Sequence, residues 1–445
     1  MREKLSGRLG FIMLAAGCAV GLGNVWRFPF IVGQNGGAAF VLVYFAFLAL
    51  FGFPLLIAEL SLGRASRCGI SGALRSLARR RGRTWHIIGS VIFSGNALLM
   101  LYYTDVGGWL LRFTESYVRF GAAPDFSAML ADCRSCAVFM LASVVAATAV
   151  CSVGVRNGVE RMTKWMMLAL LALIVVLAVK ALGLEGASKG LEFYLKPDWS
   201  KVAARPAKVI FDAMGQAFFT LSVGVGCMTI FGSYIDRGQS LVKESALIVV
   251  VDTFVAFVSG LIIFPASATY GIAVDAGPGL IFEALPKVFA AMEGGRVWGT
   301  VFFLFLSLAA FTTIIAVFEC IIGGIVDETG WRRTRVALAT GAAVAAGSLP
   351  AVFIPGALEL EDFVFSQFWL PLGALSVCIF VSRRFGWGFS GFREEASAGD
   401  GPDLPLWSRM LYRWVIPAMI IAVIAGGPSR PKVNELSESK PSDCL

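Results

Sequence analysis

The chain has 445 residues, of which 57% are hydrophobic and only 15% are charged, and its net charge is +8. Soluble domains carry about 25% charged residues, and a single globular core would not bury this much apolar surface. A transmembrane barrel would show short alternating strands instead of long apolar runs. The composition therefore predicts an all-α membrane protein in a lipid bilayer. The basic residues lie in short segments between apolar runs, which indicates topology and argues against nucleic-acid binding.

Apolar runs of about 20 residues, the length that crosses a bilayer, recur eleven times. Their centres lie near Ala19, Phe51, Leu101, Val144, Leu173, Thr220, Val258, Leu308, Val344, Ala374 and Ile420. The segments 2–8 and 64–83 are rich in basic residues, so the positive-inside rule predicts a cytoplasmic N-terminus. An odd number of spans then places the C-terminus outside, with a polar tail over 427–445 that is predicted to be disordered.

Few residues offer chemistry of the catalytic kind. His86 is the only histidine, and no Ser/His/Asp, Cys/His or metal constellation accompanies it, so the sequence argues against an enzyme. Cys133 and Cys136 lie in a loop after the third span, where a local disulfide or free thiols are favoured over a zinc site. Glu59, Asp105 and Glu319 are acids in apolar surroundings and have no assigned role.

Glycines interrupt two of the predicted spans in the same way. The first span contains AGCAVGLGN and the sixth contains FFTLSVGVGC, so both carry the pattern Val-Gly-x-Gly near the middle of the bilayer. Glycine permits conformations that break a helix, although close packing of helices through small residues is an alternative explanation. The two spans are five apart, and matching interrupted segments in two halves indicate a transporter built from inverted repeats.

Polar residues within the apolar spans support a central binding site. They are Asn24, Thr220, Ser222, Asp252, Thr312 and Thr313. A carboxylate such as Asp252 at that depth costs roughly 2.5 to 3.5 kcal/mol, so it should have a partner. Any one hydroxyl could bond to its own helix instead. Taken together, these oxygen ligands suit a hard cation such as Na+, beside a zwitterionic substrate.

The segments RLGFIMLAAGCAVGLGNVWRFPFIVGQNGGAAF and GQAFFTLSVGVG, with the run from Ala309 to Thr313, resemble the neurotransmitter:sodium symporter family, in particular its bacterial amino-acid transporters of LeuT type. The resemblance covers about residues 2–426. It implies a single transporter domain, residues 1–426, with two inverted repeats of five helices, about 8–183 and 207–383. An eleventh helix follows over about 409–426, and the first and sixth helices would be unwound at midplane.

The resemblance also implies a substrate site and two Na+ ions. The first sodium site would use Ala19, Asn24, Thr220 and Asp252. The second would use Gly17, Val20, Ala309, Thr312 and Thr313. The amino-acid substrate would lie among Ala19, Leu22, Gly23, Leu99, Tyr103, Phe219, Thr220, Ser222, Val225, Thr313 and Val317.

Gates on either side of the substrate follow from the same resemblance. The outer gate would consist of the ion pair between Arg27 and Asp362, with Gln216 beside it and the rings of Tyr103 and Phe219 beneath. The inner gate would consist of the ion pair between Arg2 and Asp327, near Ser233 and Tyr234. Charged residues at solvated helix ends are the alternative explanation for any one of these.

Departures from the family pattern bear on the substrate and the ions. Gly21 stands where monoamine transporters carry an aspartate, which favours a substrate with its own carboxylate. Asp252 and Ala256 stand where chloride-dependent members have asparagine and serine, so transport is expected to be independent of chloride. Val225 replaces a phenylalanine of the leucine transporter, which favours hydrophobic or aromatic amino acids. Leu168 stands where several relatives have proline, so this position favours helix.

The function that follows is sodium-coupled import of a hydrophobic or aromatic amino acid by alternating access. The alternative is a transporter-like sensor that binds an amino acid without translocating it. The predicted location is a bacterial inner membrane, and the sequence indicates no obligate protein partner.

Overall fold

The computed structural model describes residues 5–271 and 279–426, and within these ranges the chain is almost entirely helical and contains no β-strand. The first part of the chain forms α1 (Arg8–Ala19), α2 (Phe28–Gln34), α3 (Ala38–Phe47), α4 (Phe53–Ser66), α5 (Ile70–Leu77), α6 (Gly82–Phe120), α7 (Phe126–Ala131), α8 (Cys133–Ser152) and α9 (Arg161–Leu182). Short π-helical segments, η1 (Gly23–Arg27), η2 (Leu48–Gly52) and η3 (Val155–Glu160), precede α2, α4 and α9.

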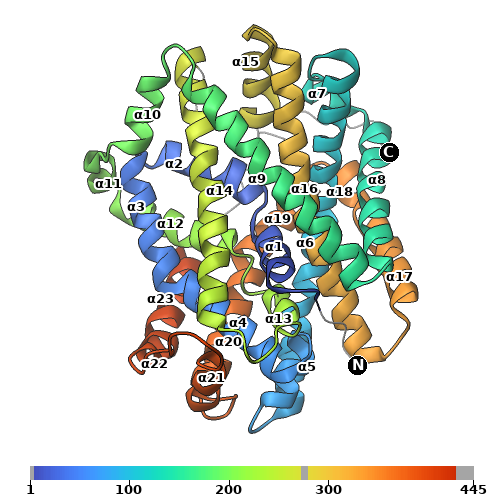
Figure 1. Ribbon diagram of the computed structural model, residues 1–445, viewed down its shortest axis with the longest axis vertical. Helices are drawn as coiled ribbons and strands as arrows, with labels where there is room; N and C mark the ends of the chain where they lie inside the picture. Colours follow the sequence, from blue (N-terminus) through green and yellow to red (C-terminus); the bar gives the residue numbers. More distant parts are fainter. Residues whose placement is uncertain (1–4, 272–278, 427–445) are drawn as a thin grey trace.

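The remaining helices follow in chain order. They are α10 (Ala187–Leu195), α11 (Trp199–Ala204), α12 (Pro206–Thr220), α13 (Cys227–Gly232), α14 (Leu241–Tyr270), α15 (Leu285–Ala291), α16 (Gly295–Thr329), α17 (Arg333–Gly347), α18 (Leu349–Phe353), α19 (Ala357–Val364), α20 (Leu370–Ser382), α21 (Phe389–Ala396), α22 (Ser408–Met410) and α23 (Ile416–Gly426). Further π-helical segments are η4 (Leu280–Ala284), η5 (Phe365–Trp369) and η6 (Leu411–Val415). Figure 1 shows α15 near one end of the helix bundle and α21 near the other, and we name the two ends after these helices.

The chain is a multi-pass membrane protein. Nine helical segments of the described residues are long and apolar enough to cross a bilayer, and the bent pair Arg8–Ala19 and Gly23–Gln34 makes a tenth. These ten match ten of the eleven predicted spans. The remaining one, centred near Thr220, is divided between α12 and α13, and each of these is too short to cross alone. The predicted tail over 427–445 lies outside the described residues.

The two broken spans lie in the middle of the bundle. Figure 1 shows α1 and α13 surrounded by longer helices, and α1 packs against α9, α13, α14 and α16. A helix that is apolar on all sides is buried on all sides, and every residue of α1 from Gly10 to Ala19 is buried. The neighbouring α16 is also largely buried and packs on α1, α6, α8 and α9. The sequence therefore positions both breaks away from lipid.

The fifth span is irregular at its start. Gly154 has a positive φ of 120°, and the π-helical segment η3 follows it. Glu160 ends this segment and accepts a hydrogen bond of 2.8 Å from the Ser6 N–H, so it ties the start of the fifth span to the start of the first. Leu168, where several relatives have proline, lies inside the regular helix α9. This agrees with the helix preference expected from leucine.

A buried charge cluster fixes α21 to the end of α4. Arg64 is 1% exposed, and its Nε lies 2.7 Å from Oε1 of Glu395, which is 3% exposed. The second carboxylate oxygen of Glu395 lies 2.6 Å from Nη2 of Arg237. Arg64 Nη1 also donates to the Gln239 carbonyl at 2.6 Å. Buried charges are tolerated only when they are paired and hydrogen-bonded in this way.

We expect Glu395→Gln to destabilise the protein, because it leaves the Arg64 charge buried without a carboxylate. Removing one partner of a buried pair costs about 3–5 kcal/mol of unfolding free energy. Unfolding of the purified protein in detergent measures the effect. The matched control is Glu394→Gln, which removes the same charge from the neighbouring exposed residue and should change stability by less than about 0.5 kcal/mol. Equal effects of the two substitutions would contradict this interpretation.

Candidate functional site

The first span breaks just after Ala19. Val20 has an extended backbone with ψ of 108°, and helical structure resumes at Gly23. The Gly21 N–H donates to Asn24 Oδ1 at 3.1 Å, which turns the chain back into η1. A Cβ at Gly21 would lie 2.8 Å from the Tyr103 hydroxyl and 2.9 Å from Thr313 Oγ1. Only glycine fits at this point, and the last carbonyl groups of α1 have no helical partner beyond the break.

The sixth span breaks between Thr220 and Cys227. Ser222, Gly224 and Gly226 all have positive φ angles, of 51°, 104° and 79°. The unwound segment 221–226 between the two half-helices is held by another span, since the Gly224 N–H donates to Glu59 Oε1 at 2.5 Å. The Ser222 hydroxyl donates to the Cys18 carbonyl at 3.1 Å, which connects this break to the first one. The glycine pattern predicted both breaks, and both are present.

The residues predicted for the first sodium site lie together beside these breaks. Asn24 Nδ2 lies 2.8 Å from Asp252 Oδ1, and Thr220 Oγ1 lies 2.9 Å from Asp252 Oδ2. All three side chains are at most 1% exposed. Ala19 is the last residue of α1, directly before the break. The buried carboxylate thus has the partners that its position demands.

The residues predicted for the second sodium site also converge. Thr313 Oγ1 lies 3.3 Å from the Gly17 carbonyl oxygen, 3.2 Å from that of Val20 and 3.3 Å from that of Ala309. Thr312 Oγ1 lies 2.9 Å from the same Ala309 oxygen. One hydroxyl proton can satisfy only one of these three carbonyl groups. Uncharged oxygens from two helices, with the Gly17 and Val20 carbonyls at the break of the first span, are a suitable ligand set for a hard cation.

A cavity of about 30 Å³ lies next to both oxygen clusters. It is lined by most of the predicted substrate residues, namely Ala19, Gly23, Leu99, Tyr103, Phe219, Ser222, Val225, Thr313 and Val317. Leu22 and Thr220 do not line it, although the Leu22 N–H donates to the Tyr103 hydroxyl at 3.2 Å. The lining also includes Gly21, which stands where monoamine transporters carry an aspartate, and four residues outside the predicted substrate set, namely Cys18, Cys227, Phe365 and Leu370. This volume holds one or two water molecules, so an amino acid enters only if the lining moves.

The predicted outer gate differs from a direct ion pair in this structure. Within the described residues, Arg27 and Asp362 do not approach within 4.0 Å of each other. The Arg27 guanidinium lies 4.3 Å from the centre of the Phe219 ring, a distance typical of a cation–π contact. Gln216 Nε2 donates to the Gly23 carbonyl at 3.2 Å and so connects α12 to η1.

The predicted inner gate contains a cluster that the sequence did not resolve. Arg2 lies outside the described residues, and its expected partner Asp327 accepts a hydrogen bond of 2.8 Å from the Gly69 N–H. Tyr234 donates to Glu319 Oε1 at 2.7 Å, and Arg333 contacts both carboxylate oxygens of Glu319. Glu319 is fully buried, so this bidentate pair satisfies a charge that could not stay unpaired.

Ser233, also predicted at the inner gate, contributes its backbone carbonyl, which accepts from Arg67 at 3.1 Å. Glu319 and Glu59 were visible in the sequence only as acids in apolar surroundings. Their partners come from other helices, so no local pattern pointed to them.

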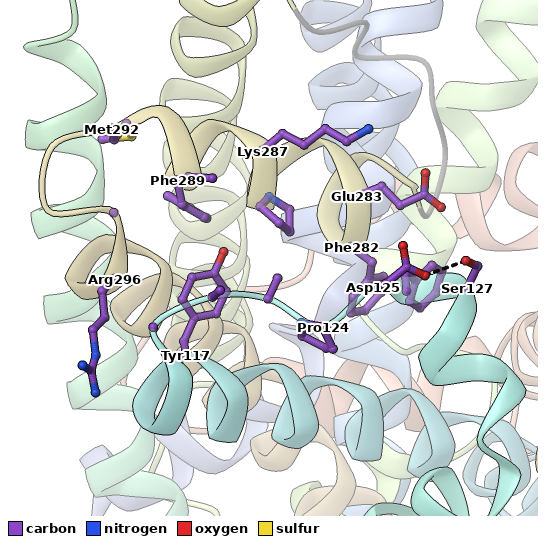
Figure 2. A pocket seen from close by; sticks show the side chains of 17 residues that line it. Tyr117, Pro124, Asp125, Ser127, Phe282, Glu283, Lys287, Phe289, Met292 and Arg296 are labelled. Atoms are coloured by element: carbon purple, nitrogen blue, oxygen red, sulfur yellow. Dashed lines mark hydrogen bonds between the residues drawn. The ribbon is translucent and has the colours of Figure 1, made fainter.

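A larger cavity, of about 760 Å³, lies at the α15 end (Figure 2). Figure 2 shows it between the end of α6 with the loop that follows and the segment formed by η4 and α15. The Ser127 hydroxyl and the Ala128 N–H donate to Asp125 Oδ1 and hold the pKa of Asp125 below its ordinary value. None of the residues predicted for substrate or sodium lines this cavity. The smaller central cavity is therefore the candidate site. Within the described residues, no group of His, Cys, Asp and Glu side chains has the geometry of a metal site.

The bundle with two broken spans around a small polar centre defines a class of membrane transporters. The chain belongs to the sodium:neurotransmitter symporter family, whose model matches residues 2–124 and 123–436. The fold is of LeuT type, and relatives in this family are transporters, not enzymes.

Individual relatives agree with this assignment. An uncharacterized sodium-dependent transporter, YhdH, of Bacillus subtilis is 30% identical over 439 residues, which are 94% of this chain and 95% of the relative. The sodium-dependent serotonin transporter of Drosophila melanogaster is 26% identical and covers 95% of this chain and 76% of its own length. The crystal structure of MhsT in complex with L-phenylalanine superimposes with a TM-score of 0.84 at 31% identity, over 96% of this chain and 99% of that one. Sodium dependence and membrane transport thus belong to the family.

We expect Gly21→Ala to weaken Na+ binding at least tenfold, or by about 1.4 kcal/mol. The added methyl group would displace the Tyr103 and Thr313 hydroxyls, which both lie within 3 Å of its position. The shift of the thermal unfolding midpoint with Na+ concentration measures the affinity. Gly215→Ala is the matched control, since a Cβ there meets no atom within 4 Å. Unchanged Na+ stabilisation in Gly21→Ala would show that the geometry of this break is not needed for the ion.

Proposed function

We propose that this protein is a sodium-coupled symporter that imports a hydrophobic or aromatic amino acid by alternating access. The observation that carries the proposal is the convergence of three carbonyl oxygens and the Thr313 hydroxyl at the break of the first span. Na+ binding there would connect α1 to α16, which are far apart in the sequence. Such a contact, made in one conformation and lost in another, allows an ion to shift a conformational equilibrium.

Two Na+ ions are proposed to bind. One would be held by Ala19, Asn24, Thr220 and Asp252, and the other by Gly17, Val20, Ala309, Thr312 and Thr313. Each charge gains roughly 2.3 kcal/mol per 100 mV, and a tenfold gradient adds about 1.4 kcal/mol. Two ions then supply about 7 kcal/mol for each transported molecule. That free energy is sufficient to concentrate a neutral zwitterion by a factor on the order of 10^5.

The substrate is proposed to bind in the central cavity with its carboxylate near the Leu22 N–H and the Tyr103 hydroxyl. These two groups now bond to each other, so a carboxylate would replace a contact that already exists. A Cβ at Gly21 would already lie 2.8 Å from the Tyr103 hydroxyl, so no acidic side chain is placed here and the substrate is proposed to bring its own carboxylate. The apolar wall of Leu99, Val225 and Val317 suits a hydrophobic side chain. MhsT, the solved relative, was crystallised with L-phenylalanine, which supports an aromatic or large aliphatic substrate.

The proposed topology places the N-terminus in the cytoplasm of a bacterial cell and the C-terminus outside. The basic segments 2–8 and 64–83 support this orientation. Residues 8–183 and 207–383 are proposed to be the two inverted repeats, with the breaks in α1 and between α12 and α13 as their equivalent points. The α21 end would then face the cytoplasm and the α15 end the outside.

Uptake of radiolabelled amino acids into proteoliposomes tests the function directly. We expect accumulation that requires an inward Na+ gradient. Thr313→Val, which removes one hydroxyl without changing volume, should raise the Na+ concentration for half-maximal uptake at least tenfold. Thr329→Val, at the exposed end of the same helix, is the control and should change it less than twofold. Sodium-dependent binding without uptake would instead favour an amino-acid sensor.

Transport is also proposed to be independent of chloride. The Asp252 carboxylate supplies a fixed negative charge beside Asn24 and Thr220, where an anion would otherwise balance Na+. We expect uptake to be the same within experimental error when chloride is replaced by gluconate. Asp252→Asn keeps the size of the side chain and removes the charge, and should lower uptake at least tenfold in gluconate. Loss of wild-type uptake in gluconate would overturn this part of the proposal.

A further inference from the structure

The unwound segment 221–226, which interrupts the sixth span, needs hydrogen-bond partners from elsewhere in the protein. Inside a membrane, each backbone group that leaves a helix must be satisfied by protein or water. Two side chains from other spans meet this need. Glu59 accepts from the Gly224 N–H, and Asn96 Nδ2 donates to the Val225 carbonyl at 2.8 Å. Asn96 therefore helps to hold the unwound segment in place, and the Val225 side chain of this segment lines the central cavity.

The Asn96 side-chain amide binds the unwound segment at Val225 and the start of α13 at Cys227. Its Oδ1 lies 2.8 Å from Cys227 Sγ, at the start of α13, while its Nδ2 also donates to the Phe93 carbonyl at 3.0 Å. The direction of the amide is fixed by its partners, because two carbonyl oxygens require the NH2 group and leave the oxygen for the thiol. Asn96 is 1% exposed. Both amide N–H groups and the amide oxygen are thus directed at its own helix, at Val225 and at Cys227.

Close packing against neighbouring helices restricts the movement of the unwound segment. Gly95 of α6 lies beside Val225, and a Cβ at Gly95 would lie 2.5 Å from Trp369 and 3.2 Å from Val225 Cγ1. On the opposite side, a Cβ at Gly224 would lie 2.2 Å from the Leu370 carbonyl oxygen. The wall of the cavity at Val225 is therefore fixed between α6 and α20. A change in the hydrogen bond from Asn96 would move the Val225 side chain relative to the cavity.

Asn96 lies on the face of α6 that forms the site. Leu99 and Tyr103 follow it at i+3 and i+7, which places all three on one side of the helix. Leu99 and Tyr103 line the cavity, whereas Asn96 lies behind Val225 and does not. One helix thus contributes the polar contact for the substrate, part of the apolar wall at Leu99, and the support for the adjoining segment that carries Val225.

We propose that Asn96 is a positioning residue that determines which side chains the transporter accepts. It holds the Val225 carbonyl and the Cys227 thiol, and so sets how far the Val225 side chain reaches into the cavity. This inference rests on the proposed function, because it assumes that an amino acid binds in the central cavity. It adds that selectivity depends on a residue that does not touch the substrate.

The substitution Asn96→Leu tests the positioning role, since it keeps the size of the side chain and removes the hydrogen bonds to the Val225 carbonyl and the Cys227 thiol. The measurement is the thermal stabilisation of the purified protein by alanine, valine, leucine, methionine, phenylalanine, tyrosine and tryptophan at saturating Na+. We expect the ratio of affinities between the best aromatic and the best aliphatic ligand to change at least tenfold. Na+ affinity without amino acid should change less than threefold, because the sodium residues lie on other helices.

Thr104→Val is the matched control. Thr104 is fully buried on the same helix and its hydroxyl lies 3.0 Å from Ser348 Oγ, away from the cavity. We expect this substitution to lower stability and leave the ratio of affinities within twofold. If Asn96→Leu does not fold, Asn96→Ser, which is too short to reach the Val225 carbonyl, should change the ratio in the same way.

The outcomes separate the two proposals. A wild-type protein that no amino acid stabilises would overturn the proposed function and this inference with it. Wild-type binding with an unchanged ratio in the Asn96 variants would overturn the inference alone. A loss of affinity that is equal for every amino acid would also overturn it, since a general structural role predicts that result.

Discussion

The whole site depends on one constraint, which is that a backbone group released from a helix inside a membrane must find another partner. Two spans of this protein are broken near their middle, and the groups they release meet different partners. The break in the first span leaves carbonyl oxygens of Gly17 and Val20 around the Thr313 hydroxyl, which can satisfy only one of them at a time. The break in the sixth span has its N–H and carbonyl groups bound by Glu59 and Asn96.

The two breaks therefore have different roles. At the first break, two carbonyl oxygens surround one hydroxyl and suit a cation, whereas the second break is held in shape by side chains of α4 and α6. The Ser222 hydroxyl links them through the Cys18 carbonyl, and the central cavity lies where they meet. An ion at the first break and a substrate against the second would therefore share one set of contacts. Such sharing gives reciprocal coupling, because each ligand favours the conformation that the other binds.

Much of the architecture could be predicted from the sequence, because apolar length and glycine placement are local properties. In the described residues, ten of the eleven predicted spans are long and apolar enough to cross a bilayer. The sixth does not meet this length because it is divided into two short helices. The side chains that satisfy the breaks could not be predicted, since they lie far away in the sequence. Glu59 is 165 residues from Gly224, and Asn96 is 129 residues from Val225. The role of Glu319 was missed as well, since its partners Tyr234 and Arg333 lie on other elements, 85 and 14 residues away.

The most direct test of the account is equilibrium binding of radiolabelled Na+ to the purified protein, with and without a saturating amino acid. The account predicts about two ions per chain and a Na+ affinity that rises at least tenfold when the amino acid is present. Saturable Na+ binding that is indifferent to every amino acid would contradict it, because the two broken spans would then not form one shared site.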